Sequence, residues 1–304
     1  TDSVIDSDGF ANGGPSHIEG KQKESGFNPK FLIQADVSDE VNIYASASKG
    51  FRIGGVNGNI PADAATATTP EGICFSEVQA LGLDPSKTKT FDSDTLWSYE
   101  TGFKSKFAQN RVTLNAAAYL IEWSNISQQN RLACGFQFIA NAGAAEIKGF
   151  EAELVFAPMD GLTYTLGAGH ANAKITDDGG VVGVSVGDRI QGVPNWTFNA
   201  SGEYIFPLMG EVDGLLRGDW NHYGESFSAN NEAANPRRRD PWDEVNLRAG
   251  VIKDNWEIAL FVDNVTNEHI NLADSRSIAA ETPGRQRLVT NRPRTIGVDI
   301  RTHF

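Results

Sequence analysis

The sequence predicts an all-β protein, an antiparallel β-barrel that spans a membrane. Polar and apolar residues alternate along most segments, and a period of two places them on opposite faces of a strand. Short and long connections between the strands alternate along the chain. Membrane barrels show the same alternation, with short turns on one side of the membrane and long loops on the other. The chain also ends in an alternating strand with a terminal aromatic residue, the usual ending of bacterial outer-membrane β-barrels.

The alternation predicts about 11 antiparallel strands in chain order. They are expected at 28–36, 41–53, 95–107, 111–124, 141–157, 162–174, 193–207, 214–227, 242–252, 256–263 and 294–304. Residues 1–25 are rich in Gly, Asp, Ser and Asn and are expected to form a loop. The whole chain, 1–304, is interpreted as one barrel domain.

Several strands alternate cleanly, and their apolar faces are rich in large residues such as Phe103, Phe150, Phe198 and Leu260. The opposite faces carry Glu100, Lys104, Glu151, Glu153, Asn199, Glu203, Arg248 and Glu257. Segment 111–124 is the exception, because both of its faces are mixed and its assignment depends on its neighbours. If the apolar faces meet lipid, the polar faces line a wet lumen; if they pack a soluble core, the polar faces are simply the exterior.

The connections give the stronger argument for a membrane. The short ones are 37–40, 108–110, 158–161, 207–213 and 253–255, and the long ones are 54–94, 125–140, 175–192, 228–241 and 264–293. Aromatic residues at many strand ends would form the two interfacial girdles of a barrel. A soluble sandwich has no reason to alternate its connections strictly, so this alternation and the terminal strand favour lipid.

Composition removes other classes of protein. No stretch approaches 18 apolar residues, which excludes a membrane-spanning helix, and the mean hydropathy is -0.33. The formal charge of -13, from 39 acidic and 26 basic residues, argues against a nucleic-acid partner. The five histidines lack ligand spacing, and the sequence shows no catalytic constellation, cofactor motif or metal site. We therefore expect a protein that is not an enzyme.

The two cysteines, Cys74 and Cys134, lie in polar, turn-rich stretches outside any CxxC motif. They are either free thiols or one disulfide that joins two exposed loops in an oxidising compartment. Because they fall in consecutive long loops on the same side of the predicted barrel, the disulfide is the preferred interpretation.

In its motifs the chain resembles the C-terminal part of a TonB-dependent outer-membrane receptor, over roughly residues 26–304. The matching segments are NIYASASKGFRIGG at 42–55, YETGFK at 99–104, IKGFE at 147–151, VDNVTNE at 262–268, RPR at 292–294 and the terminal Phe304. Each motif is moderately specific alone, and their order makes the resemblance strong.

The resemblance implies one half of a barrel of roughly 22 strands. The plug domain that such receptors carry, and through which TonB is contacted, has no counterpart in this sequence. A half barrel has two open edges, so 28–36 and 294–304 are expected either to be unpaired or to pair with each other. The last strand, with Ile296, Val298, Ile300 and Phe304 on one face, is expected to be the assembly signal read by the barrel-assembly machinery.

Two places could contact a ligand. Arg237, Arg238 and Arg239 form a charge run in a long loop, and arginine forks suit carboxylate, catecholate or phosphate oxygens. The alternative for this run is contact with lipopolysaccharide phosphates or with nearby aspartates. Arg52, at the base of the 54–94 loop, is a weaker candidate because it belongs to a strand motif and could be structural.

The leading functional hypothesis is a receptor and transporter fragment in the outer membrane of a Gram-negative bacterium. It would bind a ferric siderophore or similar scarce nutrient, with membrane lipid and lipopolysaccharide around it, and depend on TonB for uptake. The alternatives are a passive channel or structural barrel without coupled transport and, less favoured, a secreted soluble β-sandwich that binds sugars.

Overall fold

The computed structural model describes residues 2–7, 16–21, 23–58, 60, 74–80, 89–132, 137–141, 143–179, 185–227, 238–276 and 286–302. Within these residues, one antiparallel sheet of 11 strands dominates, in the order β21-β18-β17-β14-β13-β12-β11-β8-β7-β4-β3. Every strand therefore pairs with the next long strand along the chain, as the alternation predicted.

The strands of this sheet match the predicted segments. They are β3 (Lys30–Ser38), β4 (Val41–Arg52), β7 (Asp94–Phe107), β8 (Val112–Ser124), β11 (Ala144–Met159), β12 (Leu162–Asp177), β13 (Trp196–Met209), β14 (Val212–Tyr223), β17 (Trp242–Lys253), β18 (Trp256–Asp263) and β21 (Thr295–Thr302). The largest boundary difference lies at the end of the predicted 214–227 strand, because β14 stops at Tyr223 and Ser226–Phe227 pair separately.

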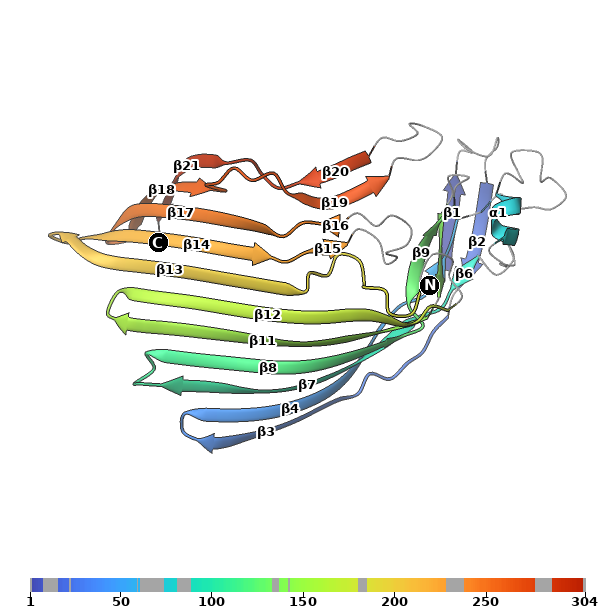
Figure 1. Ribbon diagram of the computed structural model, residues 1–304, viewed down its shortest axis with the longest axis horizontal. Helices are drawn as coiled ribbons and strands as arrows, with labels where there is room; N and C mark the ends of the chain where they lie inside the picture. The colour runs from blue at the N-terminus through green and yellow to red at the C-terminus, as the bar shows by residue number, and fades with distance from the viewer. Residues whose placement is uncertain are drawn as a thin grey trace.

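The sheet is curved and open. β3 and β21 each have one neighbour in it, which confirms the expectation of unpaired edges rather than mutual closure. Figure 1 shows the short turns together at one end of the strands and the long connections at the other. The predicted separation of short and long connections is therefore present in space.

The long connections hold the smaller elements. These are β5 (Gly55–Val56), α1 (Phe75–Ala80), β6 (Thr90–Phe91), β9 (Ser127–Arg131), β10 (Gln137–Asn141), β15 (Ser226–Phe227), β16 (Arg238–Arg239), β19 (Asn271–Arg276) and β20 (Gln286–Thr290). The prediction of a loop over residues 1–25 is wrong in part, because β1 (Asp2–Ser7) and β2 (Ser16–Lys21) pair as a hairpin. The alternating apolar residues Val4, Ile18 and their neighbours are too few to stand out from the Gly- and Asp-rich background.

The two faces of the sheet differ in chemistry. The cross-strand registers place all eight polar residues predicted for the lumen side on one face. We call this the concave face; it holds a pocket lined mostly by polar and charged side chains. The opposite, convex face carries Phe103, Phe150, Phe198 and Leu260, as predicted, and Leu260 is 62% exposed.

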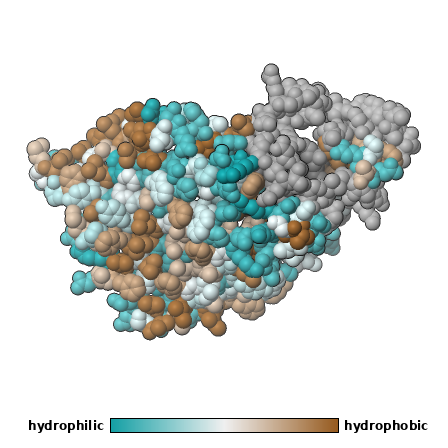
Figure 2. Space-filling view, in the orientation of Figure 1, coloured by the Kyte–Doolittle hydropathy of each residue, from teal (hydrophilic) through white to brown (hydrophobic). Residues whose placement is uncertain are grey.

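The convex face does not pack a dry core. Hydrophobic surface is spread over the strand region of the molecule in Figure 2, and Ile296, at the β21 edge, is 72% exposed. Within the described residues every other sheet has only two strands, so no second large sheet packs against the convex face there, as a β-sandwich would require. An exposed apolar face of this kind is typical of the lipid-facing side of a membrane barrel.

Aromatic rings that cover glycines of the neighbouring strand recur on both faces of the sheet. In five cross-strand pairs the ring lies where a Cβ of the glycine would be: Tyr44–Gly102, Tyr119–Gly149, Tyr164–Gly202, Phe206–Gly214 and Phe261–Gly297. Such pairs fix register and permit curvature. One of them includes Tyr119 of the mixed segment 111–124, which lies on the concave side over Gly149.

Candidate functional site

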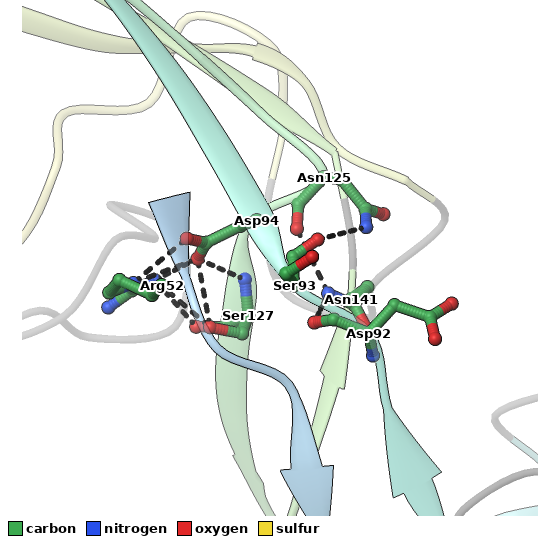
Figure 3. A network of polar contacts seen from close by, with 7 residues as sticks. All are labelled: Arg52, Asp92, Ser93, Asp94, Asn125, Ser127 and Asn141. Atoms are coloured by element: carbon green, nitrogen blue, oxygen red, sulfur yellow. Dashed lines mark hydrogen bonds and ion pairs between the residues drawn. The ribbon is translucent and has the colours of Figure 1, made fainter. Parts of the chain in front are cut away.

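The ends of β4, β7 and β8 build a polar cluster at the base of the long loops (Figure 3). Arg52 and Asp94 are direct partners across β4 and β7. The Arg52 Nε donates to both Asp94 carboxylate oxygens, at 3.0 and 2.9 Å. Ser127 donates to the same carboxylate through its N–H at 3.0 Å and its hydroxyl at 2.9 Å. The Arg52 Nη2 is a fourth donor to this carboxylate. Because the Asp94 side chain is only 2% exposed, the four donors surround a buried anion.

This cluster decides what Arg52 does in the fold. Its guanidinium also lies 4.6 Å from the centre of the Trp123 ring, a cation–π contact. Arg52 thus connects three strand ends. A structural role was one of the two roles predicted for it. The other, contact with a ligand, stays a prediction, and the side chain is still 54% exposed.

Two asparagines join the 54–94 loop to residues 125–141 by imitating strand pairing. Asn57 donates to the Ile139 carbonyl at 2.6 Å and accepts from the Ile139 N–H at 2.8 Å. Asn141 makes the same reciprocal pair with the Asp92 backbone, at 2.7 and 2.6 Å. Each side-chain amide replaces a peptide unit, so the two loops are held in a fixed register.

A small apolar cluster packs between the same loops. Ile60, Cys74 and Val78 come from the first loop, and Leu132 and Phe138 come from the second, all of them buried. Cys74 is fully buried and disulfide-bonded. Its expected partner, Cys134, lies outside the described residues, so the pairing itself stays a prediction. Together with the asparagine pairs, the cluster makes the two loops one unit, which we call the loop module.

Replacing Cys74 with serine is expected to loosen the loop module. Loss of a disulfide that closes a long loop costs about 2–4 kcal/mol, and a hydroxyl would replace the buried sulfur. Amide hydrogen exchange in the α1 and β10 segments should accelerate, while exchange in β12 and β13 should not change. Non-reducing mass spectrometry gives the independent check, since a free thiol at Cys74 or Cys134 in the native protein would contradict the pairing.

A second polar cluster gathers where β12, β13 and β14 leave the sheet. Glu225 bridges two arginines: its Oε1 accepts a hydrogen bond from Arg189 Nη1 at 3.1 Å, and its Oε2 forms an ion pair with Arg238 Nε at 3.1 Å. Arg189 also donates to Asn195 Oδ1 at 2.5 Å, and its guanidinium lies 4.7 Å from the centre of the Phe227 ring. We call Arg189, Glu225 and Arg238 the arginine bridge.

The predicted ligand arginines do not form one site. Arg238 and Arg239 make up β16, Arg238 is exposed and Arg239 half-buried, and Arg237 lies outside the described residues. Among the described residues, Arg238 forms ion pairs with Glu225 and, at 3.5 Å, with Asp240, each through its Nε. Arg52 belongs to β4, and five strands of the sheet stand between β4 and β14. The fold therefore places two separate, partly exposed and ion-paired arginines at the loop end.

The concave face below the loops is lined by compensated charges. Arg217 pairs with Glu203 at 3.2 Å and Asp219 at 2.7 Å, and Arg248 pairs with Glu257 at 2.6 Å and Asp299 at 2.9 Å. These side chains border a pocket of about 470 Å³ on strands β13 to β21. A further hydrogen bond, from Tyr44 to Glu100 at 2.6 Å, lies on the other half of the same face. A surface lined by ion-paired and hydrogen-bonded side chains favours contact with water over contact with apolar groups.

The described residues show neither a metal centre nor a helical membrane span. No group of three or more His, Cys, Asp or Glu side chains among them could hold a metal ion. No helix in the described part of the chain is long and apolar enough to cross a membrane.

The family model for TonB dependent receptor-like β-barrels matches residues 2–265. The chain belongs to this family. Solved receptors share its fold at low sequence identity. The ferric yersiniabactin uptake receptor FyuA from Yersinia pestis has a TM-score of 0.73 at 19% identity, over 96% of this chain and 39% of that one. The ferric-catecholate import receptor Fiu from Escherichia coli K12 has a TM-score of 0.66 at 15% identity, over 100% and 40%.

A third similar structure is the ferripyoverdine receptor of the outer membrane of Pseudomonas aeruginosa, with a TM-score of 0.61 at 17% identity, over 98% of this chain and 35% of that one. The family and these neighbours are receptors rather than enzymes. This receptor barrel chain spans about two-fifths or less of the length of each of them. The family assigned from sequence motifs is thus confirmed, as is the similarity of the 11-stranded sheet to receptor barrels.

Sequence reasoning missed the residues that complete the two clusters of this receptor barrel. Asp94 was unremarkable in the sequence, although an acidic residue at a strand start, opposite an arginine at a strand end, was a usable signal. Arg189 and Glu225 are 36 residues apart in loops without a periodic pattern, so no local signal links them.

Proposed function

We propose that this chain forms part of the barrel wall and loops of an outer-membrane receptor. The receptor takes up an anionic iron complex, most favourably a ferric siderophore, in a TonB-dependent way. The observation that carries the proposal is that partly exposed arginines at the loop end and a polar concave face belong to one curved sheet with an apolar back. A ligand captured at the loop end would meet a water-lined surface below it.

The arginine bridge favours an anionic ligand. Glu225 orients Arg238 through its Nε, and the side chain of Arg238 is 60% exposed at the loop end. A guanidinium held in this way can present its planar fork to carboxylate or catecholate oxygens with little loss of side-chain entropy. The named neighbours for yersiniabactin, catecholates and pyoverdine agree with this class of ligand.

The proposal includes partners that act on the whole receptor. Energy coupling would come from TonB through a plug domain seated against the concave face. Assembly would use the barrel-assembly machinery, which would read the exposed Ile296, Val298 and Ile300 row of the β21 edge together with Phe304, a residue outside the described set. Outer-membrane lipid and lipopolysaccharide would surround the convex face.

Changing Arg238 and Arg239 to glutamine in the intact receptor is expected to weaken binding of a ferric siderophore by roughly tenfold for each arginine that contacts it, the usual size of a charge-assisted hydrogen bond. Arg111→Gln is the matched control, since Arg111 is also exposed and ion-paired, with Asp160 at 2.9 Å, but lies in a short turn at the opposite end. Equal affinities in all variants would refute the ligand role of β16.

A passive channel is the second candidate, favoured by the charge-compensated pocket on the concave face, which suits a water-filled pore. Uptake measured with and without TonB separates the two. Transport that is unaffected by removal of TonB supports the channel and contradicts the receptor.

A further inference from the structure

The long connection between β18 and β21 is closed at its base by asparagine side chains. Asn264, the residue after β18, is 2% exposed and has a left-handed backbone with φ 51°. Its Nδ2 donates to the Glu268 carbonyl at 2.9 Å and to the Arg292 carbonyl at 3.0 Å. Its Oδ1 accepts from the Glu268 N–H at 2.9 Å and from the Thr266 hydroxyl at 3.4 Å. All four hydrogen-bonding positions of the amide are therefore used.

Two more asparagines take part in the same joint. Asn267, also left-handed with φ 55°, accepts from the Arg294 N–H at 2.9 Å through its Oδ1. Asn291 donates to the Glu268 carbonyl at 3.0 Å and accepts from the Ile270 N–H at 3.0 Å. Amide side chains thus join the end of β18 to the start of β21 where the strand ladder has stopped. We call them the asparagine clamp: Asn264, Asn267 and Asn291.

β21 needs a register signal because its apolar pattern repeats every two residues. The observed register pairs three aliphatic residues on each strand: Ile258–Ile300, Leu260–Val298 and Val262–Ile296. A slip of β21 by two residues would still place aliphatic side chains opposite one another on the convex face. A tight turn would fix the register by its geometry, but the connection over 264–294 is too long to do so.

A slip would show its consequences on the concave face. Two residues correspond to about 7 Å along a strand. Asp299, whose Oδ2 lies 2.9 Å from Arg248 Nη1, would move out of reach of this partner on β17. Phe261 would no longer face Gly297, the residue that its ring covers. These contacts stabilise the observed register once β21 is in place, whereas the clamp acts where the chain enters the strand.

We propose that the asparagine clamp sets the register of β21 and so positions Asp299 and Arg301 in the wall of the charge-lined concave pocket. The clamp can act as a measure of chain position because its partners across the connection are backbone groups, those of Arg292, Arg294 and Ile270. Each of these groups is found at one place along the chain only. The inference goes beyond the proposed function, because it holds for any ligand that the receptor carries.

The test measures the register by cysteine cross-linking in the intact receptor in outer membranes, with the cross-linked peptides identified by mass spectrometry after mild oxidation. Leu260→Cys with Val298→Cys reports the observed register. Leu260→Cys with Ile296→Cys, or with Ile300→Cys, reports a slip of two residues in one direction or the other. Residues directly opposite each other lie within the range of a disulfide, whereas diagonal neighbours are about 7–8 Å apart and lie beyond it.

Asn264→Gly and Asn267→Gly remove the amides but keep a residue that adopts the left-handed backbone freely. Asn267→Asp is the matched control, since its carboxylate can still accept from the Arg294 N–H. Asn125→Gly is the second control, because Asn125 is also left-handed, with φ 56°, and its Nδ2 also bonds a carbonyl, that of Ser93 at 3.0 Å, in another connection. Heat-modifiable migration in gel electrophoresis identifies the folded protein in which the cross-links are compared.

We expect the ratio of slipped to native cross-links to rise by roughly tenfold in Asn267→Gly, the usual effect of leaving one buried donor without its acceptor. The rise should be larger in Asn264→Gly, and both controls should keep the ratio of the unchanged receptor. An unchanged ratio in Asn267→Gly would overturn the proposal, even if Asn264→Gly does not fold. An equal rise in Asn125→Gly would also overturn it, since loss of any loop amide would then be enough. Siderophore uptake by the same variants reports on the proposed function separately.

Discussion

Gly149→Ala is expected to prevent most of the chain from reaching its folded, membrane-inserted state. A Cβ at this position would fall within van der Waals contact distance of the His170 carbonyl oxygen and of the Tyr119 hydroxyl. The tyrosine could rotate away, but the carbonyl belongs to the backbone of β12 and cannot move without breaking the ladder. Overpacking of this kind costs about 1–3 kcal/mol or more in a well-packed site, and β11 is central in the sheet.

The measurement is the yield of heat-modifiable protein in the outer membrane. Gly218→Ala is the control, because Gly218 also lies inside a sheet strand but its Cβ would meet only Leu247 at 3.4 Å, an ordinary contact. A normal yield for Gly149→Ala would contradict this prediction. It would show that the backbones of β11 and β12 can move apart enough to accommodate a Cβ at this position.

Asp94→Ala should detach the loop module from the sheet. The substitution leaves Arg52 and the Ser127 N–H without the acceptor that now satisfies them. The Arg52 side chain is 54% exposed and can be hydrated after the change, but the Ser127 N–H loses its acceptor. Leaving such a donor unsatisfied costs about 1–3 kcal/mol, and we expect a value in this range for local opening of residues 53–58 and 125–132. Hydrogen exchange resolved by segment is the measurement, since global unfolding of the sheet should change little.

The control for this prediction is Asp160→Ala. Asp160 is also paired with an arginine, but its side chain is 97% exposed, so the loss should stay within about 0.5 kcal/mol. Similar effects of the two substitutions would mean that burial of Asp94 contributes little. The affinity of the Asp94 variant for a ferric siderophore then tests whether attachment of the loop module to the sheet affects ligand binding.

The strands could be predicted because the information that defines them is local. A residue pointing to lipid and its neighbour pointing to water differ in polarity, so segments such as 95–107 and 256–263 reveal their faces without any knowledge of partners. Segment 111–124 was ambiguous for a non-local reason. Tyr119 is on the polar side because Gly149, thirty residues away, needs covering.

The candidate site was predicted less well. Arg52 was named for its charge, yet its place between Asp94, Ser127 and Trp123 depends on three strand ends meeting. The run at 237–239 was named as one unit, whereas Arg238 works with Glu225 and Arg189 from other connections. The hairpin of β1 and β2 was missed because its short strands lack a strong alternating pattern.

The sequence by itself therefore determined the class, the number of long strands, the side of each that is apolar and the family, because each depends on residue order within a single segment. Only the tertiary structure decided that the edges stay open, that two loops share one buried cluster, and which acid meets which arginine. Those outcomes depend on contacts between segments far apart in the chain, whose geometry is set by register and curvature rather than by local pattern.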